Sequence, residues 1–597
     1  MADISQQITQ LEASIAALEA QQALLGPAVV EAALAPLRQQ LAALKSSASQ
    51  APGAVRLEGE RKQVTILFAD ISGFTAMSET TDPEQIRSLM NACFDHLVPA
   101  IHKYGGVVDK FIGDEIMALF GAPVAHENDP ERALRAALEM AGRLEEFNQR
   151  RGTDLGLHFG VNTGTVIAGG IGSSTQQQYS VMGDAVNIAS RLEDVSDRGE
   201  IFVGPDTYRL TAPLFDFEAL PPVQLKGRAE AVPIYRLVQA KSQPGRVRGL
   251  AGLESPMVGR GAELQALLKR SAAAQTGQGG AVVITGEPGL GKTRLIAEWK
   301  AAAGKLRWIE GRCLSYGQNL AYHLLVDLLH SAIEVPASAG EEETRQALER
   351  LCAGLFGETA IDTYPYLGHL LALHLDGAAL ERVRLLDPQA LQGQYRAALR
   401  RLLLALAARQ PAALVFEDIH WADPSSSELL TWLLPLHSEA ALLFCFITRP
   451  EQDTPGWRIV TGLREAPNQE QFTEIALQPL TEDDSRQLVA NLLEIEALPE
   501  SIRTTILKKA EGNPFFVEEV IRMLIDRGVI VRNAAGSWQA VKEIENVEIP
   551  DTLQALLLAR IDRLPSEVRH VLRVASVIGR QFSVPVLEEV LRRYRRE

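Results

Sequence analysis

The chain has 597 residues, of which 46% are hydrophobic and 22% are charged, a balance that excludes a disordered or collagen-like protein. With 59 basic and 75 acidic residues the net charge is −16, which argues against a nucleic-acid partner because such proteins carry a basic surface. The four cysteines form no CxxC pair, which excludes a disulfide-rich secreted domain and favours the reducing cytoplasm.

The first 48 residues have the pattern of a coiled coil. Apolar residues follow a 4,3 spacing from Ile4 to Leu18 and again from Val30 to Leu44, with a break at Gly26-Pro27. We expect a helical hairpin or a dimer stalk, the alternative being a helix packed on its own domain. The start, MADISQQITQ, lacks a signal-peptide pattern, and no apolar run reaches the roughly 18–20 residues of a membrane span, so we expect no membrane contact.

Residues 58–240 alternate strands and helices, which predicts one α/β domain. The following residues, 241–256, are rich in Gly, Pro and Arg and form a predicted linker. The predicted strands are 64–69, two strands within 107–120 that join near Gly113-Asp114, 155–161 and 166–168, and the predicted helices are 83–104, 130–150 and 184–195.

Two aspartates in this domain lie at predicted strand ends. Asp70 follows an apolar strand in FADISGFT, and Asp114 lies at the hairpin bend in DKFIGDEIMALFG. Two such carboxylates can hold a pair of divalent ions, which activate an attacking oxygen and neutralise a leaving group in phosphoryl chemistry. An aspartate after a strand is more often a turn residue or a helix cap, so the spacing by itself is a weak signal.

Three segments in this region, FADISGFT, KFIGDEIMALFG and YSVMGDAVNIASRLE, resemble the class III nucleotidyl cyclases. The resemblance implies a ferredoxin-like βαββαβ fold, a dimer with active sites at its interface, and conversion of a nucleoside triphosphate to its 3′,5′-cyclic monophosphate and pyrophosphate. The family divides each site between two subunits, and this chain carries every role once. We therefore expect a symmetric homodimer, formed through the cyclase domain and the coiled coil.

The resemblance also implies roles for individual residues. Asp70 and Asp114 would bind two Mg²⁺ or Mn²⁺ ions, Asn187 would orient the ribose, and Arg191 would stabilise the reacting phosphorus. Lys110 would select adenine, because lysine only donates and suits the acceptor N1 of that base. The further substrate-binding positions are Ile71, Gly73, Phe74, Thr75, Ser180 and, for the terminal phosphates, Lys226.

One position departs from the membrane-bound adenylyl cyclases. Ser180 stands where those enzymes carry a second base-reading aspartate, and a hydroxyl there resembles the bacterial relatives of the soluble adenylyl cyclases. A hydroxyl accepts a hydrogen bond from the adenine amino group but discriminates less strictly than a carboxylate. Lys110 favours an adenylyl cyclase, and Ser180 leaves a guanylyl or mixed-specificity cyclase open.

Residues 286–293 read GEPGLGKT and match a phosphate-binding loop between a predicted strand, 281–285, and a predicted helix, 294–300. Its glycines would let backbone N–H groups surround the phosphates of ATP, its lysine would reach the β- and γ-phosphates, and its threonine would bind Mg²⁺. The residues with these roles are Gly286, Gly289, Gly291, Lys292 and Thr293.

Residues 257–597 as a whole resemble the signal-transduction ATPases of the AAA-related group. Glu417 and Asp418 end the apolar strand in LVFEDIHWAD, which suits metal binding and water positioning. By the resemblance Arg449, in ITRPE, would sense the γ-phosphate, the alternative being a surface salt bridge. Pro514, in GNPFF, would approach the nucleotide from a helical lid, the alternative being a simple helix-start proline.

The sequence thus predicts a multidomain α/β protein. Its parts are coiled-coil helices at 1–48, a ferredoxin-like cyclase domain at 58–240, a linker at 241–256, a P-loop ATPase domain at 257–480, and a helical lid with a winged-helix-like region at 481–597. We expect a cytoplasmic adenylyl cyclase controlled by an attached ATP switch, with an unknown regulatory partner. A non-catalytic signalling scaffold or transcription regulator stays open, and the chain is either a shortened member of its group or a fragment.

Overall fold

The computed structural model describes residues 60–73, 82–173, 176–224, 231–241, 255–318, 320–336, 339–466, 469–493, 500–526, 528–532, 538–540 and parts of 561–590. The predicted coiled coil at 1–48 and most of the linker lie outside the described residues. Residues 62–166 and 183–597 belong to one compact unit, and the hairpin 167–182 belongs to a second. All four cysteines are free and buried. None of the described helices is both long and apolar enough to cross a membrane.

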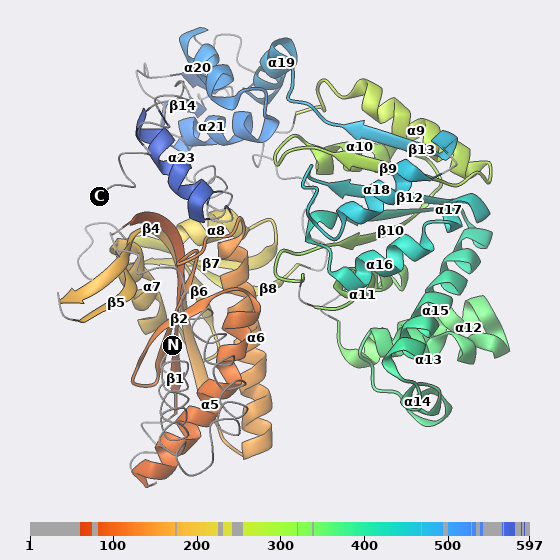
Figure 1. Ribbon diagram of the computed structural model, residues 1–597. Coiled ribbons are helices and arrows are strands. Elements are labelled where there is room, and N and C mark those ends of the chain that lie inside the picture. Colours follow the sequence, from red (N-terminus) through yellow and green to blue (C-terminus); the bar gives the residue numbers. More distant parts are fainter. Residues whose placement is uncertain are drawn as a thin grey trace, which may run out of the picture. The chain divides into compact units, whose positions relative to one another are not determined.

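The cyclase region is an eight-stranded mixed sheet with the path β2-β3-β1-β4-β6-β8-β7, and β5 pairs with β4 (Figure 1). The chain order β1-α5-β2-β3-α6-β4 over this path is the predicted βαββαβ arrangement. The elements are β1 (Glu60–Ser72), α5 (Pro83–Lys103), β2 (Val107–Ile112), β3 (Glu115–Phe120), α6 (Asp129–Arg151), β4 (Gly156–Ser173), β5 (Gln176–Met182), α7 (Asp184–Asp194), β6 (Ile201–Val203), α8 (Pro205–Thr211), β7 (Phe215–Val223) and β8 (Val232–Ala240).

The segments predicted as strands, 155–161 and 166–168, do form strand, but they belong to one continuous strand, β4, and not to two. In the polar stretch between them, Asn162 and Thr163 are buried in the sheet. The Thr163 hydroxyl lies 2.9 Å from that of Thr65 and 2.8 Å from that of Thr207. These buried hydroxyls satisfy one another, so the strand continues through residues that look exposed in the sequence.

Two helices cover one face of this sheet, and α7 covers the other. Apolar side chains of α5 and α6 pack with Leu67 and Ala69 of β1 in one buried cluster. Ile188 and Leu192 of α7 pack with Phe202 of β6 in a separate cluster. Because neighbouring residues of a strand point to opposite faces, these clusters lie on the two sides of the sheet.

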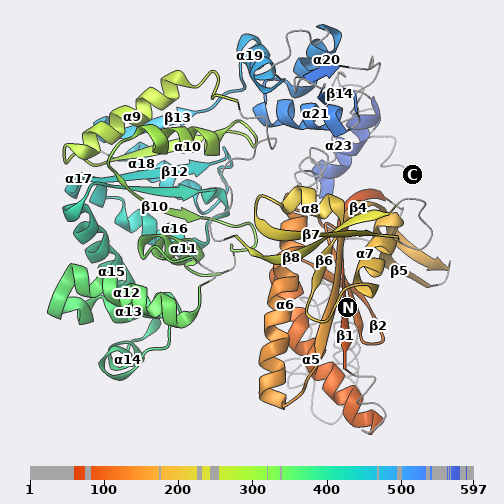
Figure 2. The ribbon, with the colours of Figure 1, turned by 180° about the vertical axis from the view of Figure 1, so that it is seen from behind.

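The ATPase region is a five-stranded parallel sheet with the order β10-β11-β12-β9-β13. Helices α9 and α10 pack on one face, and α11, α12, α13, α15, α16 and α18 pack on the other (Figure 2). The elements are α9 (Gly261–Gln275), β9 (Gly280–Thr285), α10 (Lys292–Ala302), β10 (Arg307–Arg312), α11 (His323–Ala332), α12 (Glu341–Phe356), α13 (Tyr364–Leu370), α14 (Gly377–Arg384), α15 (Pro388–Arg409), β11 (Ala412–Glu417), α16 (Pro424–Leu433), α17 (Leu436–Glu439), β12 (Leu442–Thr448), α18 (Trp457–Glu465) and β13 (Phe472–Ala476), with short 3₁₀ helices at Gly357–Asp362, Ile419–Trp421 and Gln469–Gln471.

The C-terminal region is mainly helical, as predicted, but it also contains the short antiparallel pair β14–β15. Helices α19, α20 and α21 share one buried apolar cluster. The winged-helix-like region stays a prediction, since residues 541–560 lie outside the described residues. The elements are α19 (Glu482–Leu493), α20 (Glu500–Ala510), α21 (Pro514–Asp526), β14 (Ile530–Arg532), β15 (Trp538–Ala540) and α23 (Ser566–Ile578).

Candidate functional site

The antiparallel pairing of β1 and β3 brings Asp70 and Asp114 to the same end of the cyclase sheet. The register sets Asp70 opposite Glu115. Asp114 lies in the turn between β2 and β3, where its carbonyl oxygen accepts a hydrogen bond of 3.3 Å from the backbone N–H of Ile71. Gly113 in this turn has φ +69°, a conformation that favours glycine. The turn therefore holds Asp114 beside the end of β1.

Carboxylates crowd this end of the sheet. Burial and the nearby charge of Asp114 raise the pKa of Asp70 above its usual value. Burial and the charge of Asp70 raise the pKa of Glu115 to about 7 and that of Glu193, on α7, to about 8. A divalent cation would relieve this repulsion, and carboxylate oxygens are the ligands that Mg²⁺ and Mn²⁺ prefer, so the residues fit such an ion.

The described residues contain no group of three or more His, Cys, Asp and Glu side chains with the geometry of a complete metal site. Mg²⁺ is commonly held by one or two carboxylates together with substrate phosphates, so two aspartates are a sufficient protein contribution. Of the neighbouring predicted positions, Ile71 is buried, and Gly73 has φ +105° beside the carbonyl of Asp154. Phe74, Thr75 and Lys226 lie outside the described residues.

The remaining cyclase residues lie on three other elements. Lys110, on the edge strand β2, is 44% exposed, and its Nζ lies 3.1 Å from a carboxylate oxygen of Asp109. Asn187 and Arg191 lie one turn apart on α7. Ser180 lies on β5, opposite Gly169 of β4. Among the described residues, neither Lys110 nor Arg191 forms a hydrogen bond or an ion pair with Asp70 or Asp114.

The phosphate-binding loop connects β9 to α10, as the sequence predicts. Gly289 and Gly291 have φ +84° and +88°. Lys292 opens α10, and its Nζ donates hydrogen bonds to the carbonyls of Gly286, at 2.6 Å, and Glu287, at 3.0 Å. Burial lowers the pKa of Lys292 to about 8, against the opposing effect of the Asp418 charge. The ammonium group thus lies folded against its own loop.

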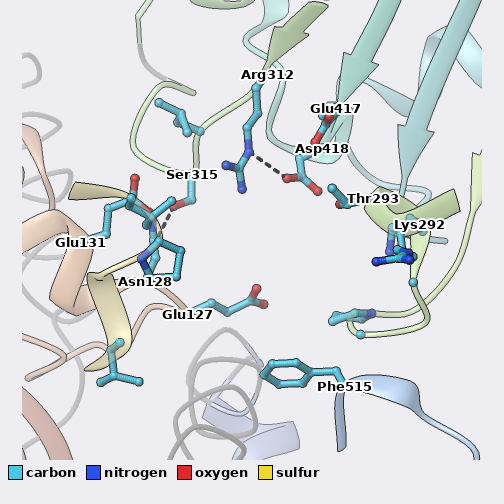
Figure 3. A pocket seen from close by; sticks show the side chains of 18 of the residues that line it. Glu127, Asn128, Glu131, Lys292, Thr293, Arg312, Ser315, Glu417, Asp418 and Phe515 are labelled. Carbon is cyan, nitrogen blue, oxygen red and sulfur yellow. Dashed lines mark hydrogen bonds and ion pairs between the residues drawn. The ribbon is translucent and has the colours of Figure 1, made fainter. Parts of the chain in front are cut away.

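Charged residues follow the carboxyl ends of the neighbouring parallel strands, the edge at which open α/β sheets bind ligands. Asp418 follows β11, and Arg449 follows β12. The Nε atom of Arg312, the last residue of β10, lies 3.5 Å from a carboxylate oxygen of Asp418 (Figure 3). Glu417 pairs with Arg312 in the parallel register. Sequence reasoning missed Arg312, because only this register shows that its strand lies beside β11.

The lid segment GNPFF contacts the loop directly. The amide nitrogen of Asn513 donates to the carbonyl of Pro288 at 2.9 Å, and the backbone N–H of Phe515 donates to the carbonyl of Gly289 at 3.3 Å. Pro514 begins α21, so it is a helix-start proline that also lies at the loop. The sequence pattern pointed to Pro514, whereas its two neighbours, Asn513 and Phe515, make the hydrogen bonds to the loop.

These groups line a cavity of about 1750 Å³. Its lining includes Lys292, Thr293, Glu417, Asp418, Arg449 and Phe515. Arg449 forms an ion pair with Glu127, so the alternative interpretation as a salt bridge holds, but the pair is not on the surface, because Arg449 is only 7% exposed. Cationic and carboxylate groups around one cavity at the end of a P-loop suit a nucleotide with its Mg²⁺ ion.

Comparisons with known proteins find family matches over both regions. Residues 58–239 match the family described as the adenylate and guanylate cyclase catalytic domain, residues 256–447 match the AAA ATPase domain, and residues 481–534 match a domain of unknown function.

Similar proteins cover one or both of these regions. An uncharacterized protein of Rhizobium meliloti (strain 1021) is 28% identical over 544 residues, which are 89% of this chain and 50% of that protein. Adenylate cyclase 1 of the same organism is 34% identical over 184 residues, 30% of this chain and 28% of that protein. The crystal structure of the adenylyl cyclase CyaB from P. aeruginosa is 33% identical and covers 31% of this chain and 98% of that one, with a TM-score of 0.30.

The chain spans about half the length, or less, of these two curated relatives. Its two family matches coincide with the cyclase sheet and with the P-loop sheet. The chain therefore carries a class III nucleotidyl cyclase domain followed by an AAA-type ATPase domain.

Proposed function

We propose that this protein is an adenylyl cyclase that converts ATP to 3′,5′-cyclic AMP and pyrophosphate at a homodimer interface, and that the attached ATPase domain is its nucleotide switch. The observation that carries the proposal is the β1–β3 pairing, which holds Asp70 beside Asp114 at a strand end crowded with carboxylates. Such a cluster of carboxylates can bind divalent ions, and these ions can in turn bind the phosphates of a nucleotide.

In the proposed reaction the 3′-oxygen of ATP attacks the α-phosphorus, the bond from that phosphorus to the bridging oxygen breaks, and pyrophosphate leaves. Two Mg²⁺ or Mn²⁺ ions would favour loss of the 3′ proton and neutralise the leaving group. Asp70 and Asp114 would hold these ions. Arg191 would stabilise charge that develops at the phosphorus, and Asn187 would orient the ribose. Lys226 would hold the terminal phosphates.

A second subunit would complete the site. Three apolar residues beside Lys110 on β2 are exposed, namely Val107 at 41%, Phe111 at 49% and Ile112 at 48%. An exposed apolar edge strand is a liability in a monomer, and a partner subunit would cover it. Lys110 and Arg191 make no bond to the aspartates of their own chain among the described residues, which suits roles toward the partner's site.

The first test is cyclic AMP formation by the purified chain with ATP and Mg²⁺ or Mn²⁺. Asp114→Ala should abolish product formation, because the ion site loses one of its two carboxylates. Asp154→Ala is the matched control, since Asp154 is an exposed aspartate paired with Arg198 and should leave activity unchanged. A parent chain that is dimeric and binds ATP but forms no product would favour the alternative of a non-catalytic scaffold.

Base selection needs a separate test, because a guanylyl cyclase is the competing enzyme. Lys110→Glu exchanges a donor for an acceptor and should shift the ATP-to-GTP preference toward GTP by about tenfold or more. Lys110→Ala is the control, and it should slow both reactions without inverting the preference. Equal use of both nucleotides by the parent chain would replace adenylyl by mixed specificity.

A further inference from the structure

Arg449 of the ATPase domain is held by a carboxylate of the cyclase domain. Its Nη1 atom donates to one oxygen of Glu127 at 2.6 Å, and its Nη2 atom donates to the other. The two side chains are only 9% and 16% exposed. Burial disfavours the charge of Arg449, but the hydrogen bonds and the charge of Glu127 raise its pKa above the usual value. Arg449 and Glu127 therefore form a bidentate ion pair that is largely shielded from water, and bidentate ion pairs of this kind are stronger than ordinary hydrogen bonds.

The pair lies at the phosphate-binding loop. Thr448, the residue before Arg449, pairs with Thr285 at the end of β9, and its carbonyl accepts a hydrogen bond of 3.3 Å from the N–H of Gly286. Figure 3 shows the Glu127 carboxylate pointing into the cavity that Lys292 and Asp418 also line. The charges of Glu127 and Arg449 both act on Lys292. Glu127 therefore lies within the electrostatic field of the P-loop lysine.

Neighbouring contacts fix the segment that carries Glu127. The Ser315 hydroxyl, just beyond β10, donates to the Asn128 side chain at 3.1 Å and accepts from Arg132 at 2.6 Å. The rings of Tyr104 and Tyr316 pack edge to face, with their centroids 4.9 Å apart. Residues 121–128 lead from β3 into α6, and β3 begins at Glu115, directly after the Asp114 turn. One strand thus connects the carboxylate on Arg449 to the cyclase metal-site turn.

A carboxylate and a terminal phosphate compete for the same arginine. Both are planar or tetrahedral oxyanions that accept the two parallel N–H groups of a guanidinium. A triphosphate held by Lys292 would bring its last phosphate toward Arg449, and two anions at one buried arginine repel each other strongly where water is excluded. A diphosphate lacks that group, so it would leave the Glu127 pair largely undisturbed.

We propose that Glu127 is an internal anion that occupies Arg449 when the P-loop holds no triphosphate, and that ATP displaces it and releases residues 121–128 of the cyclase domain. This displacement would be the way in which ATP binding at the P-loop regulates the proposed cyclase. The proposal rests on the proposed ATP-binding switch and not on cyclase turnover, so its failure can be told apart from failure of the cyclase assignment.

The test is nucleotide binding to the full chain, measured by calorimetry with the β,γ-imido analogue of ATP and with ADP. The binding that Lys292→Ala removes is assigned to the P-loop, and an Asp114→Asn background suppresses cyclase turnover. Glu127→Gln should tighten binding of the ATP analogue by about tenfold or more, because the buried competitor loses its charge. It should change the ADP affinity by less than about twofold.

Glu451→Gln is the matched control. Glu451 also faces Arg449, at 3.8 Å from Nη1, but it is 39% exposed and makes no two-pronged pair, so this change should leave both affinities nearly unaltered. In an Arg449→Ala background, Glu127→Gln should lose its effect, since the shared arginine is gone. Unchanged or weaker binding of the ATP analogue to Glu127→Gln would overturn the proposal.

A measurement on the parent chain needs no variant. Hydrogen exchange of backbone amides in 121–128 and 313–317 should speed up when the ATP analogue is added, and ADP should have little effect. Slower or unchanged exchange in both segments with the analogue bound would mean that the Glu127 contact survives triphosphate binding, and that the switch does not exist.

Discussion

The side-chain amide of Asn513 donates a hydrogen bond of 2.9 Å to the carbonyl oxygen of Pro288, and so joins the lid to the phosphate-binding loop across 225 residues of sequence. The Asn513 side-chain oxygen also accepts from the N–H of Phe515 at 3.1 Å, at the start of α21. One side chain therefore caps the lid helix and holds it on the loop. We therefore predict that Asn513 couples nucleotide binding at the loop to the position of the lid.

Asn513→Ala should weaken nucleotide binding at the P-loop by about fivefold, since a hydrogen bond of this kind contributes about 1 kcal/mol. Calorimetry with ADP measures the change. Thr276→Ala is the control, because Thr276 bonds only to a nearby carbonyl on an exposed helix end and should leave the affinity unchanged. An unaltered ADP affinity in Asn513→Ala would show that the lid does not contribute to binding.

Two glycines of the loop offer a matched comparison. At both, alanine would be strained, since φ is +84° at Gly289 and +88° at Gly291, and this costs about 1–2 kcal/mol. At Gly289 the added Cβ would also lie 2.5 Å from the Asn513 side chain and 2.9 Å from Phe515 Cβ, whereas nothing lies within 4 Å at Gly291. In urea unfolding without nucleotide, Gly289→Ala should be the more destabilised by about 1–3 kcal/mol. An equal decrease in the free energy of unfolding in Gly289→Ala and Gly291→Ala would mean that the lid moves away from the loop without cost.

Glu518 on α21 should make the lid less stable as pH rises. Burial raises the pKa of Glu518 to about 7 from its usual 4.5, against the opposing charge of Arg522. The folded state thus binds the proton of Glu518 more tightly than the unfolded state does. The protonated carboxyl therefore makes its full contribution to the free energy of unfolding below about pH 4.5. This contribution falls between pH 4.5 and 7, and it does not change further above pH 7. The loss is at most about 3 kcal/mol.

Glu518→Gln should therefore unfold at a higher urea concentration than the parent at pH 8 and at nearly the same one at pH 5. The exposed Glu511, changed to Gln, is the control and should reproduce the parent at both values. A Glu518→Gln variant that is no more stable than the parent at pH 8 would mean that the carboxyl is ionised without cost.

Divalent ions should stabilise the cyclase domain even without nucleotide, because they relieve the repulsion around Asp70. Adding Mn²⁺ at about a hundred times its Kd should increase the unfolding free energy by about 2.7 kcal/mol. Asp70→Asn and Asp114→Asn should lose this effect, and the surface variant Asp154→Asn should keep it. Thermal unfolding with and without EDTA makes the comparison. An equal Mn²⁺ effect in all three variants would place the ion elsewhere.

The order of elements could be predicted from the sequence because it depends on local pattern. Apolar periodicity located β1, α5, α6 and β9, and glycine with a following lysine located the phosphate-binding loop. The strand residues expected at 155–161 and 166–168 form one strand and not two, and the hydroxyl bonds of Thr163 to Thr65 and Thr207 between them join partners that are far apart in the chain. Local polarity cannot show that a threonine will find such partners.

The sequence by itself determined which two domain families the protein carries, because each motif holds its characteristic residues within a few positions of one another. Only the tertiary structure decided which motifs meet. Strand register set Glu115 opposite Asp70 and Arg312 opposite Glu417, and the lid placed Asn513 on the loop. The pairing of Glu127 with Arg449 spans 322 residues, and no sequence pattern marks either residue as the other's partner. Long-range pairing follows from how whole elements pack, which no short segment encodes.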